Sequence, residues 1–127
     1  MVSKMRTRRI GDRIREELST LLIMEVKDPA VAGAFITDVE VDGELAFADV
    51  YVSCLEGSAR SEEILEGLQR AAGFLRSTLA RNIALRVFPR LRFHWDPTPE
   101  QADHMETLFA RLRAEAEARN KGETSLD

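Results

Sequence analysis

Apolar residues recur at intervals of three and four along three stretches of the chain, a spacing that places them on one face of an α-helix. The first stretch covers about residues 7–26, the second covers residues 61–82, and the third begins at Thr98. Asp28-Pro29 ends the first stretch, because the residue before a proline avoids the helical region. The pattern therefore predicts three amphipathic helices.

The helix that begins at Thr98 has a clear start signal. Thr98 can cap it, Pro99 suits its first position, and Gln101 occupies the capping-box position. We expect its apolar stripe to be buried; the stripe consists of Ala102, Met105, Leu108, Phe109 and Leu112. Its later part is polar. The expected organisation is one domain over residues 1–114, followed by a short polar tail over residues 115–127.

Two runs between the first and second helices alternate with period two, which is typical of β-strands. In residues 35–41 the alternation places on one face Phe35, Thr37, Val39 and Val41. In residues 45–54 the corresponding set is Ala48, Val50, Val52 and Cys54. Asp42-Gly43 lies between the runs and is a turn signal. These features predict an antiparallel hairpin with one buried face and one exposed face.

A third strand is expected near Pro89. Residues 83–87 are one candidate segment, and Leu91, Phe93 and Trp95 alternate after the proline. Because proline has no amide proton, Pro89 either bulges this strand or places it at a sheet edge. The shared phase of Phe93 and Trp95 favours core packing over stacking on nucleic-acid bases.

The middle helix contains a break at Gly73 that leaves its phase unchanged. Its stripe continues from Ile64 to Leu79, so Gly73 is expected to kink one long helix, which stops near Asn82. Ser61 is expected to cap its start. The order is then helix, strand, strand, helix–kink–helix, strand, helix. It predicts an α+β domain in which helices pack on one face of a three-stranded sheet.

Charge is strongly segregated along the 127 residues, although the net charge is only −4. Residues 1–20 have six basic and three acidic groups, and residues 21–69 have two and eleven. Residues 70–92 have six basic groups and no acidic ones, and residues 93–127 have four and eight. All six arginines of that basic stretch lie within Gly67–Trp95, which holds no Asp or Glu. An acidic protein can therefore still present a local basic surface.

The sequence argues against several functional classes. Cys54 is the single cysteine, so an intrachain disulfide and a multi-cysteine zinc site are excluded. No Walker-type loop, dinucleotide fingerprint or nucleophile elbow is present, so we expect no enzyme and no cofactor. His94 and His104, beside Asp96, lack metal-ligand spacing. The start of the chain resembles no signal peptide and no run spans a bilayer, so we expect a cytoplasmic protein.

The arginines are the remaining functional signal. Arg70, Arg76 and Arg81 lie off the apolar stripe of the middle helix, around the expected kink. A second basic strip on the first helix includes Arg8, Arg9 and Arg13. Arginine donors suit phosphate oxygens, which favours a nucleic-acid backbone as ligand. The alternative is a solvated surface whose charges pair with the acidic residues 21–69.

The motifs together resemble the ribosome-binding factor A (RbfA) family over roughly residues 6–112. The resemblance is carried by the hairpin phrase Ile36-Thr37-Asp38-Val39-Glu40-Val41, by Val50-Tyr51-Val52-Ser53, by Ala71-Ala72-Gly73-Phe74-Leu75-Arg76, and by Pro89, Leu91, Phe93 and Asp96. It implies a KH-like fold of type II topology in which an Ala-x-Gly kink replaces the usual GxxG loop.

The resemblance also implies a partner. Family members bind the 30S subunit late in its assembly, contacting 16S rRNA, and are not enzymes. An assembly GTPase is a possible further partner, and we expect a monomer. The residues expected to face RNA are Arg8, Arg9, Arg13, Arg70, Ala71, Gly73, Arg76, Arg81 and Arg90.

Two alternatives remain open from the sequence. One is a KH-like protein-interaction module with no ribosome role, which would use the acidic hairpin as its binding face. The other is a small enzyme that uses His94, Asp96 and His104.

Overall fold

The computed structural model describes the backbone of residues 2–125 and the side chains of residues 2–121. The helices are α1 (Lys4–Met24), α2 (Ser61–Asn82) and α3 (Thr98–Ser125). The strands are β1 (Ala34–Val41), β2 (Phe47–Cys54) and β3 (Arg90–Trp95). Two single 3-10 turns occupy Pro29–Val31 and Ser58–Arg60. The chain divides into two compact units, the first ending at Asp96 and the second beginning at Pro97.

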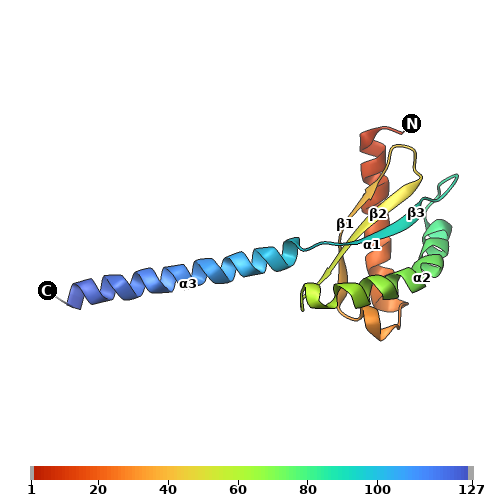
Figure 1. Ribbon diagram of the computed structural model, residues 1–127. Coiled ribbons are helices and arrows are strands. Elements are labelled where there is room, and N and C mark those ends of the chain that lie inside the picture. The colour runs from red at the N-terminus through yellow and green to blue at the C-terminus, as the bar shows by residue number, and fades with distance from the viewer. Residues whose placement is uncertain (1, 126–127) are drawn as a thin grey trace. The chain divides into compact units, whose positions relative to one another are not determined.

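The first unit is the predicted α+β domain, with the strand order β1-β2-β3 (Figure 1). β1 and β2 are antiparallel, whereas β2 and β3 are parallel. The parallel pair requires a crossover, which α2 supplies. β3 lies at the sheet edge and begins directly after Pro89, which therefore needs to donate no ladder hydrogen bond.

One core holds α1 and α2 against a single face of the sheet. From α1 come Ile14 and Leu18, both fully buried, and from α2 come four more fully buried side chains, namely Ile64, Leu68, Leu75 and Leu79. They join one cluster with the inward residues of β2, Ala48, Val50, Val52 and Cys54. The predicted phase of β2 and of both helices is confirmed. Leu91, Phe93 and Trp95 pack against the same cluster, so the core interpretation of Phe93 and Trp95 is also confirmed.

α1 begins and ends slightly earlier than predicted. Ser3 caps it, since its hydroxyl accepts a hydrogen bond from the Arg6 amide at 3.2 Å. Gly11 faces β1 so closely that a Cβ there would lie 2.7 Å from the Val39 carbonyl oxygen. This glycine lets the helix approach the sheet.

The predicted facing of the first half of β1 is wrong, because a β-bulge changes its phase. Ile36 pairs with Val52 and Asp38 pairs with Tyr51, so Thr37 is an extra residue in the ladder. Ile36 is consequently buried, whereas Phe35 is 37% exposed. Beyond the bulge, Val39 points into the core as predicted. A bulge depends on register with the partner strand, which alternation within one strand does not reveal.

Two predictions about the ends of elements are also corrected. Residues 83–87 form a loop, in which Ile83 is buried but Val87 is 70% exposed. Ser61 does not cap α2, because the 3-10 turn before it already places Ser61 in helical geometry and makes Arg60 the cap position. The predicted stop at Asn82 is confirmed.

α2 is one helix whose axis bends. Its helical assignment is unbroken from Ser61 to Asn82, and the ribbon changes direction near the middle (Figure 1). Glu62 and Glu63 lie in its first turn and Arg81 in its last, which complements the helix dipole at both ends. The expectation of a bent but continuous helix therefore agrees with the structure.

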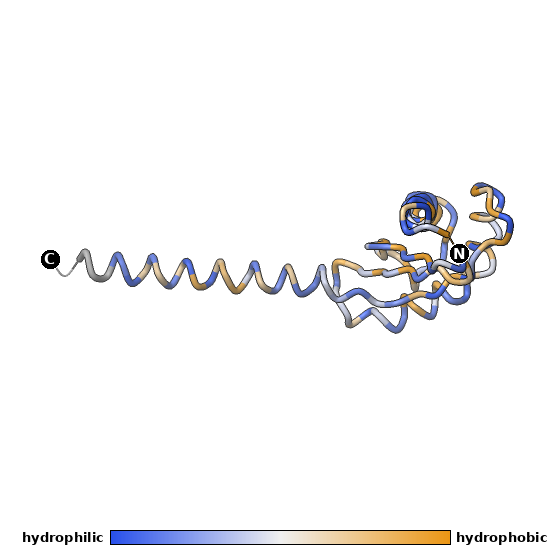
Figure 2. The backbone as a smooth tube through the Cα atoms, turned by 90° about the horizontal axis from the view of Figure 1, so that it is seen from above, coloured by the Kyte–Doolittle hydropathy of each residue, from blue (hydrophilic) through white to orange (hydrophobic). Residues whose placement is uncertain are grey.

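The second unit contains α3, and the burial of its apolar stripe against other elements stays a prediction. Within this unit Met105, Leu108, Phe109 and Leu112 are between 40% and 49% exposed, and Ala102 is exposed too. Hydrophobic residues recur along it among hydrophilic ones (Figure 2). The helix also continues to Ser125, beyond the polar transition seen in the sequence. The extent of the domain, residues 1–114, stays a prediction, while the unit that holds the core ends at Asp96. No helix of the described residues is long and apolar enough to cross a bilayer.

Candidate nucleic-acid interface

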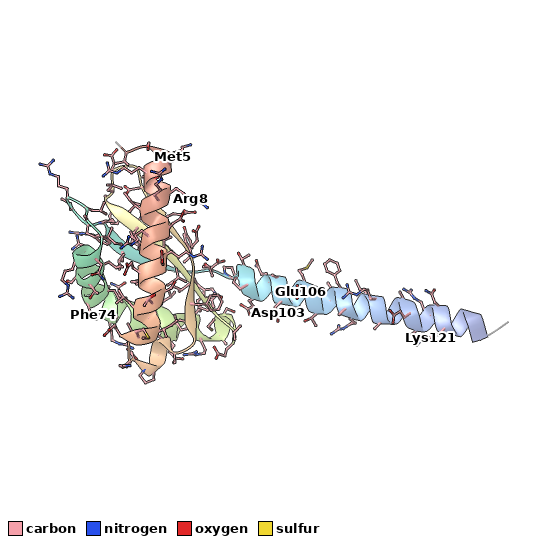
Figure 3. The ribbon with its side chains drawn as sticks, turned by 180° about the vertical axis from the view of Figure 1, so that it is seen from behind. Met5, Arg8, Phe74, Asp103, Glu106 and Lys121 are labelled. Atoms are coloured by element: carbon pink, nitrogen blue, oxygen red, sulfur yellow. The ribbon has the colours of Figure 1, made fainter. Side chains whose placement is uncertain are left out.

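The arginines of α1 are exposed but do not form one strip. Arg9 and Arg13 are four residues apart and share one side of the helix, whereas Arg8 points elsewhere. Arg8 lines a shallow depression that also includes Asp38 and Glu40 of β1, whose carboxylates disfavour a phosphate there. Met5 and Arg8 mark the N-terminal part of α1 in Figure 3.

The ion pairs of these arginines are too weak to prevent the guanidinium groups from binding an anionic ligand. Arg8 lies 3.8 Å from Asp12, and the two side chains are 82% and 60% exposed. Arg13 lies 3.1 Å from Glu17. Exposed pairs four residues apart on a helix contribute only about 0.3–0.5 kcal/mol. Arg13 can therefore exchange its partner for a phosphate at little cost.

Arg70 has a specific partner 42 residues away in the chain. Its Nη2 donates to Asp28 Oδ2 at 2.9 Å and its Nε to the same oxygen at 3.3 Å. Asp28 also accepts from the Ala30 amide at 3.0 Å. That amide and then Arg70 lower the pKa of Asp28 below its usual value. The guanidinium is still 59% exposed, so it is oriented by Asp28 while facing solvent.

Arg76 serves the fold. Its Nη2 donates to the Phe88 carbonyl at 2.6 Å and its Nε to the Pro89 carbonyl at 3.2 Å. These bonds tie the 83–89 loop to α2 just before β3 begins. Its N–H donors therefore point at the protein. Arg76 holds the 83–89 loop in place, and these donors are not available to bind a phosphate.

Arg81 and Arg90 are both exposed. Arg81 donates to Thr78 Oγ1 at 3.3 Å, which anchors its guanidinium one turn back along α2. Arg90 is the first residue of β3, and its amide donates to the Ala46 carbonyl at 2.9 Å. Together with Arg8, Arg9 and Arg13, these are the sequence-predicted arginines whose side chains face solvent without a long-range partner inside the described part of the chain.

Gly73 and Ala71 flank the bend of α2 in different ways. Ala71 is half-buried and packs against the core. Gly73 is exposed, and a Cβ built on it would meet no atom within 4 Å. The expected close approach at Gly73 is therefore not an internal contact, and the open space beside the backbone is available to a ligand.

Sequence analysis missed Phe74, the neighbour of Gly73. Phe74 is 48% exposed and lies where the α2 ribbon turns (Figure 3). Its position off the Ile64–Leu79 stripe was the available signal. An aromatic ring on the outward face of an arginine-bearing helix adds a flat apolar surface to the charged groups.

His94 is held by side chains of the sheet. His94 Nε2 lies 2.7 Å from Asp49 Oδ1, and its ring stacks on Tyr51 with centroids 5.2 Å apart. Asp96 instead accepts from the Thr37 hydroxyl at 2.6 Å. Among the described residues, no group of three potential ligands from His, Cys, Asp and Glu is placed to hold a metal ion.

Cys54 is a core residue. Its thiol lies 3.5 Å from the Gly57 carbonyl, to which it donates, and burial raises its pKa. A buried thiol with a raised pKa is a poor nucleophile.

The structure thus defines a class: a small α+β domain of KH-like topology whose bent second helix carries arginines within a segment, Gly67–Trp95, that holds no Asp or Glu. The model of the family "Ribosome-binding factor A" matches residues 6–109. A protein of that name from Alcanivorax borkumensis is 48% identical over 87% of this chain and 81% of its own length. One from Thioalkalivibrio sulfidiphilus is 42% identical, covering 91% and 89% of the two chains. The chain belongs to the ribosome-binding factor A family.

Solved structures agree with the fold. The solution structure of a putative ribosome-binding factor A from Thermotoga maritima aligns with a TM-score of 0.64 at 31% identity, covering 74% of this chain and 90% of that one. A homology model of Thermus thermophilus ribosome-binding factor A, fitted into a cryo-EM map of a 30S complex, aligns with a TM-score of 0.58 at 24% identity, covering 68% of this chain and 91% of that one. The latter likeness supports the fold alone.

Proposed function

We propose that this protein is a ribosome-assembly factor that binds the 30S subunit and its 16S rRNA during late small-subunit maturation, in the cytoplasm and without catalysing a reaction. The observation that carries the proposal is the coincidence of family membership with an arginine-bearing segment, Gly67–Trp95, that holds no Asp or Glu. The name shared by the family and its relatives, ribosome-binding factor A, agrees with the same partner.

Within the predicted set, the contacts divide the roles. Arg9, Arg13, Arg81 and Arg90 face solvent and would neutralise phosphates directly. Arg70 would do so while held by Asp28. Arg76 would act indirectly, by fixing the 83–89 loop. Binding to folded rRNA would rest on backbone and 2′-OH contacts, because the grooves of double-helical RNA give little access to base edges.

The first test measures binding to purified 30S subunits over a range of salt concentrations. We expect Arg9→Gln with Arg81→Gln to weaken binding about tenfold and to reduce the salt dependence by about one unit of slope for each lost phosphate contact. The matched control is Arg111→Gln with Arg113→Gln on α3, which removes the same charge. Equal binding by wild type and by the first variant would contradict the proposed face.

Late maturation and the competing protein-interaction role are tested in the same system. Crosslinking to immature and mature 30S particles, with the crosslinked nucleotides mapped, should give preferential crosslinks to 16S rRNA in the immature particles. Binding that does not change with salt, with crosslinks to ribosomal proteins alone, would favour the KH-like protein-interaction module. An assembly GTPase as release factor, and action as a monomer, remain part of the proposal.

A further inference from the structure

Phe74 is an outlier among the apolar residues of α2. Ile64, Leu68, Leu75 and Leu79 are completely buried, whereas Phe74 is 48% exposed and belongs neither to the core nor to the residues packed against it. Burial of a phenylalanine side chain is worth about 1.5–3 kcal/mol, and much of that is not realised here. The ring therefore has apolar surface available for a partner.

The side chains around Phe74 are mostly small, polar or basic. Residues three, four and seven positions apart share one helix face, which places with Phe74 the residues Gly67, Arg70, Ala71, Ser77, Thr78 and Arg81. Thr78 donates to the Phe74 carbonyl at 2.9 Å and accepts from Arg81 at 3.3 Å, so the Arg81 guanidinium is anchored on the turn beside the ring. On the other side, Gly73 leaves open space.

The side chains around Phe74 distinguish between two kinds of partner. An apolar protein groove would require a wider hydrophobic patch, but the neighbours of Phe74 on this face are arginine, serine, threonine, glycine and the half-buried Ala71. A single flat ring with guanidinium groups on either side matches an unstacked nucleotide, whose base has a planar face and whose phosphates are anionic. The segment Gly67–Trp95 holds no Asp or Glu, and Asp28, whose carboxylate contacts Arg70, leaves the Arg70 side chain 59% exposed.

We infer that Phe74 is a stacking platform for one unpaired base of rRNA, with Arg81 and Arg70 holding the adjacent phosphates. The inference rests on the proposed function and adds to it: the site takes a single-stranded or bulged RNA segment at the bend of α2, in addition to backbone contacts with helical RNA. Phe74 would then bind an exposed base of any identity, because every base has a planar face that can stack on the ring.

The experiment compares Phe74→Tyr with Phe74→Leu in the full chain. Tyrosine keeps the aromatic ring, and leucine keeps apolar volume but loses the flat face. Affinity is measured for purified 30S subunits and, separately, for protein-free 16S rRNA. Leu55→Ala is the matched control, because Leu55 is 94% exposed after the end of β2. Urea denaturation of each variant verifies that the fold is intact.

We expect Phe74→Tyr to bind within about twofold of wild type and Phe74→Leu to bind about tenfold more weakly to both RNA probes, a loss equivalent to about 1.4 kcal/mol. Wild-type affinity in Phe74→Leu would overturn the inference. A tyrosine variant weaker than the leucine variant, or a loss confined to whole 30S subunits, would instead indicate a pocket on a ribosomal protein and overturn it too. If wild type itself binds no 30S subunits, the proposed function fails together with this inference.

Discussion

Gly67 and Gly73 lie six positions apart in α2, yet their surroundings differ completely. A Cβ on Gly67 would lie 2.8 Å from Val31 Cγ1 and 3.1 Å from the Ala30 Cβ, so the helix touches the 3-10 turn there. A Cβ on Gly73 would meet nothing within 4 Å. The same residue type thus permits close packing at one position and leaves an open surface at the other.

Alanine at these two positions should have opposite effects on stability. Gly67→Ala overpacks the contact with Val31 and is expected to lower the free energy of unfolding by about 1–2 kcal/mol. Gly73→Ala should raise it by about 0.5–1 kcal/mol, because alanine has the higher helix propensity. Urea denaturation measures both. A loss of stability in Gly73→Ala would show that the bend itself requires glycine.

Asp49 connects stability to pH. Burial alone would raise its pKa, but hydrogen bonds from Arg92 and His94 outweigh that effect and lower the pKa below 3.8. A pKa that is lower in the folded state stabilises the protein above the unfolded-state value, and this stabilisation is lost as pH falls through the folded-state value.

We therefore expect Asp49→Asn to be less stable than wild type near neutral pH, with the difference shrinking once the pH falls below about 3.8. Urea midpoints measured across this range provide the comparison. Asp12→Asn is a control, since Asp12 is 60% exposed and its ion pair with Arg8 spans 3.8 Å. A difference that stays constant down to the lowest pH would contradict this account of Asp49.

At the scale of elements, the junction between α2 and β3 depends on Arg76. The 83–89 loop has buried residues at Ile83 and Phe88, but its backbone forms no strand. Arg76 supplies two donors to carbonyls of this loop. The loop is thereby aligned so that β3 can enter the sheet parallel to β2.

Removal of these donors should cost stability without a change in helix content. Arg76→Ala is expected to lower the free energy of unfolding by about 1–3 kcal/mol, since buried carbonyls lose their partners. Arg81→Ala, on the exposed face of the same helix, should stay within about 0.5 kcal/mol of wild type. Chemical denaturation tests the pair. Equal stabilities would mean that the loop is held by packing of Phe88 alone.

At the scale of the whole molecule, the first unit has a core of its own. Its buried core residues lie between Ile10 and Phe88, and the packed residues around them extend to Trp95. Asp96 completes the unit through its hydrogen bond with Thr37.

Two shortened chains test the predicted domain boundary at residue 114. A chain that ends at Ala114 should keep a free energy of unfolding within about 0.5 kcal/mol of the full chain, because residues 115–127 are mostly polar. A chain that ends at Pro99 lacks the apolar stripe at residues 102–112 and should be less stable by more than about 1.5 kcal/mol. Urea denaturation and circular dichroism measure both chains. Equal stability of the two shortened chains would contradict the predicted burial of the stripe.

Much of this fold follows from local pattern. The phases of α1, α2 and β2, the stop at Asn82 and the inward set of β3 were all predicted, because periods of 3.6 and 2 map directly onto faces of helices and strands. The stripe of α3 has an equally good pattern, but its burial stays a prediction. An apolar face indicates that its burial is favourable, but it does not identify the surface against which it is buried.

The candidate site was less predictable. The sequence by itself determined that an acid-free run of arginines lies on a helix with a bend at its centre. Only the tertiary structure decided that Arg70 meets Asp28, that Arg76 holds the 83–89 loop, and that Phe74 faces outward. It also decided the bulge at Thr37, through register with β2. The physical reason is that these features depend on partners distant in the chain, and local periodicity carries no information about such partners.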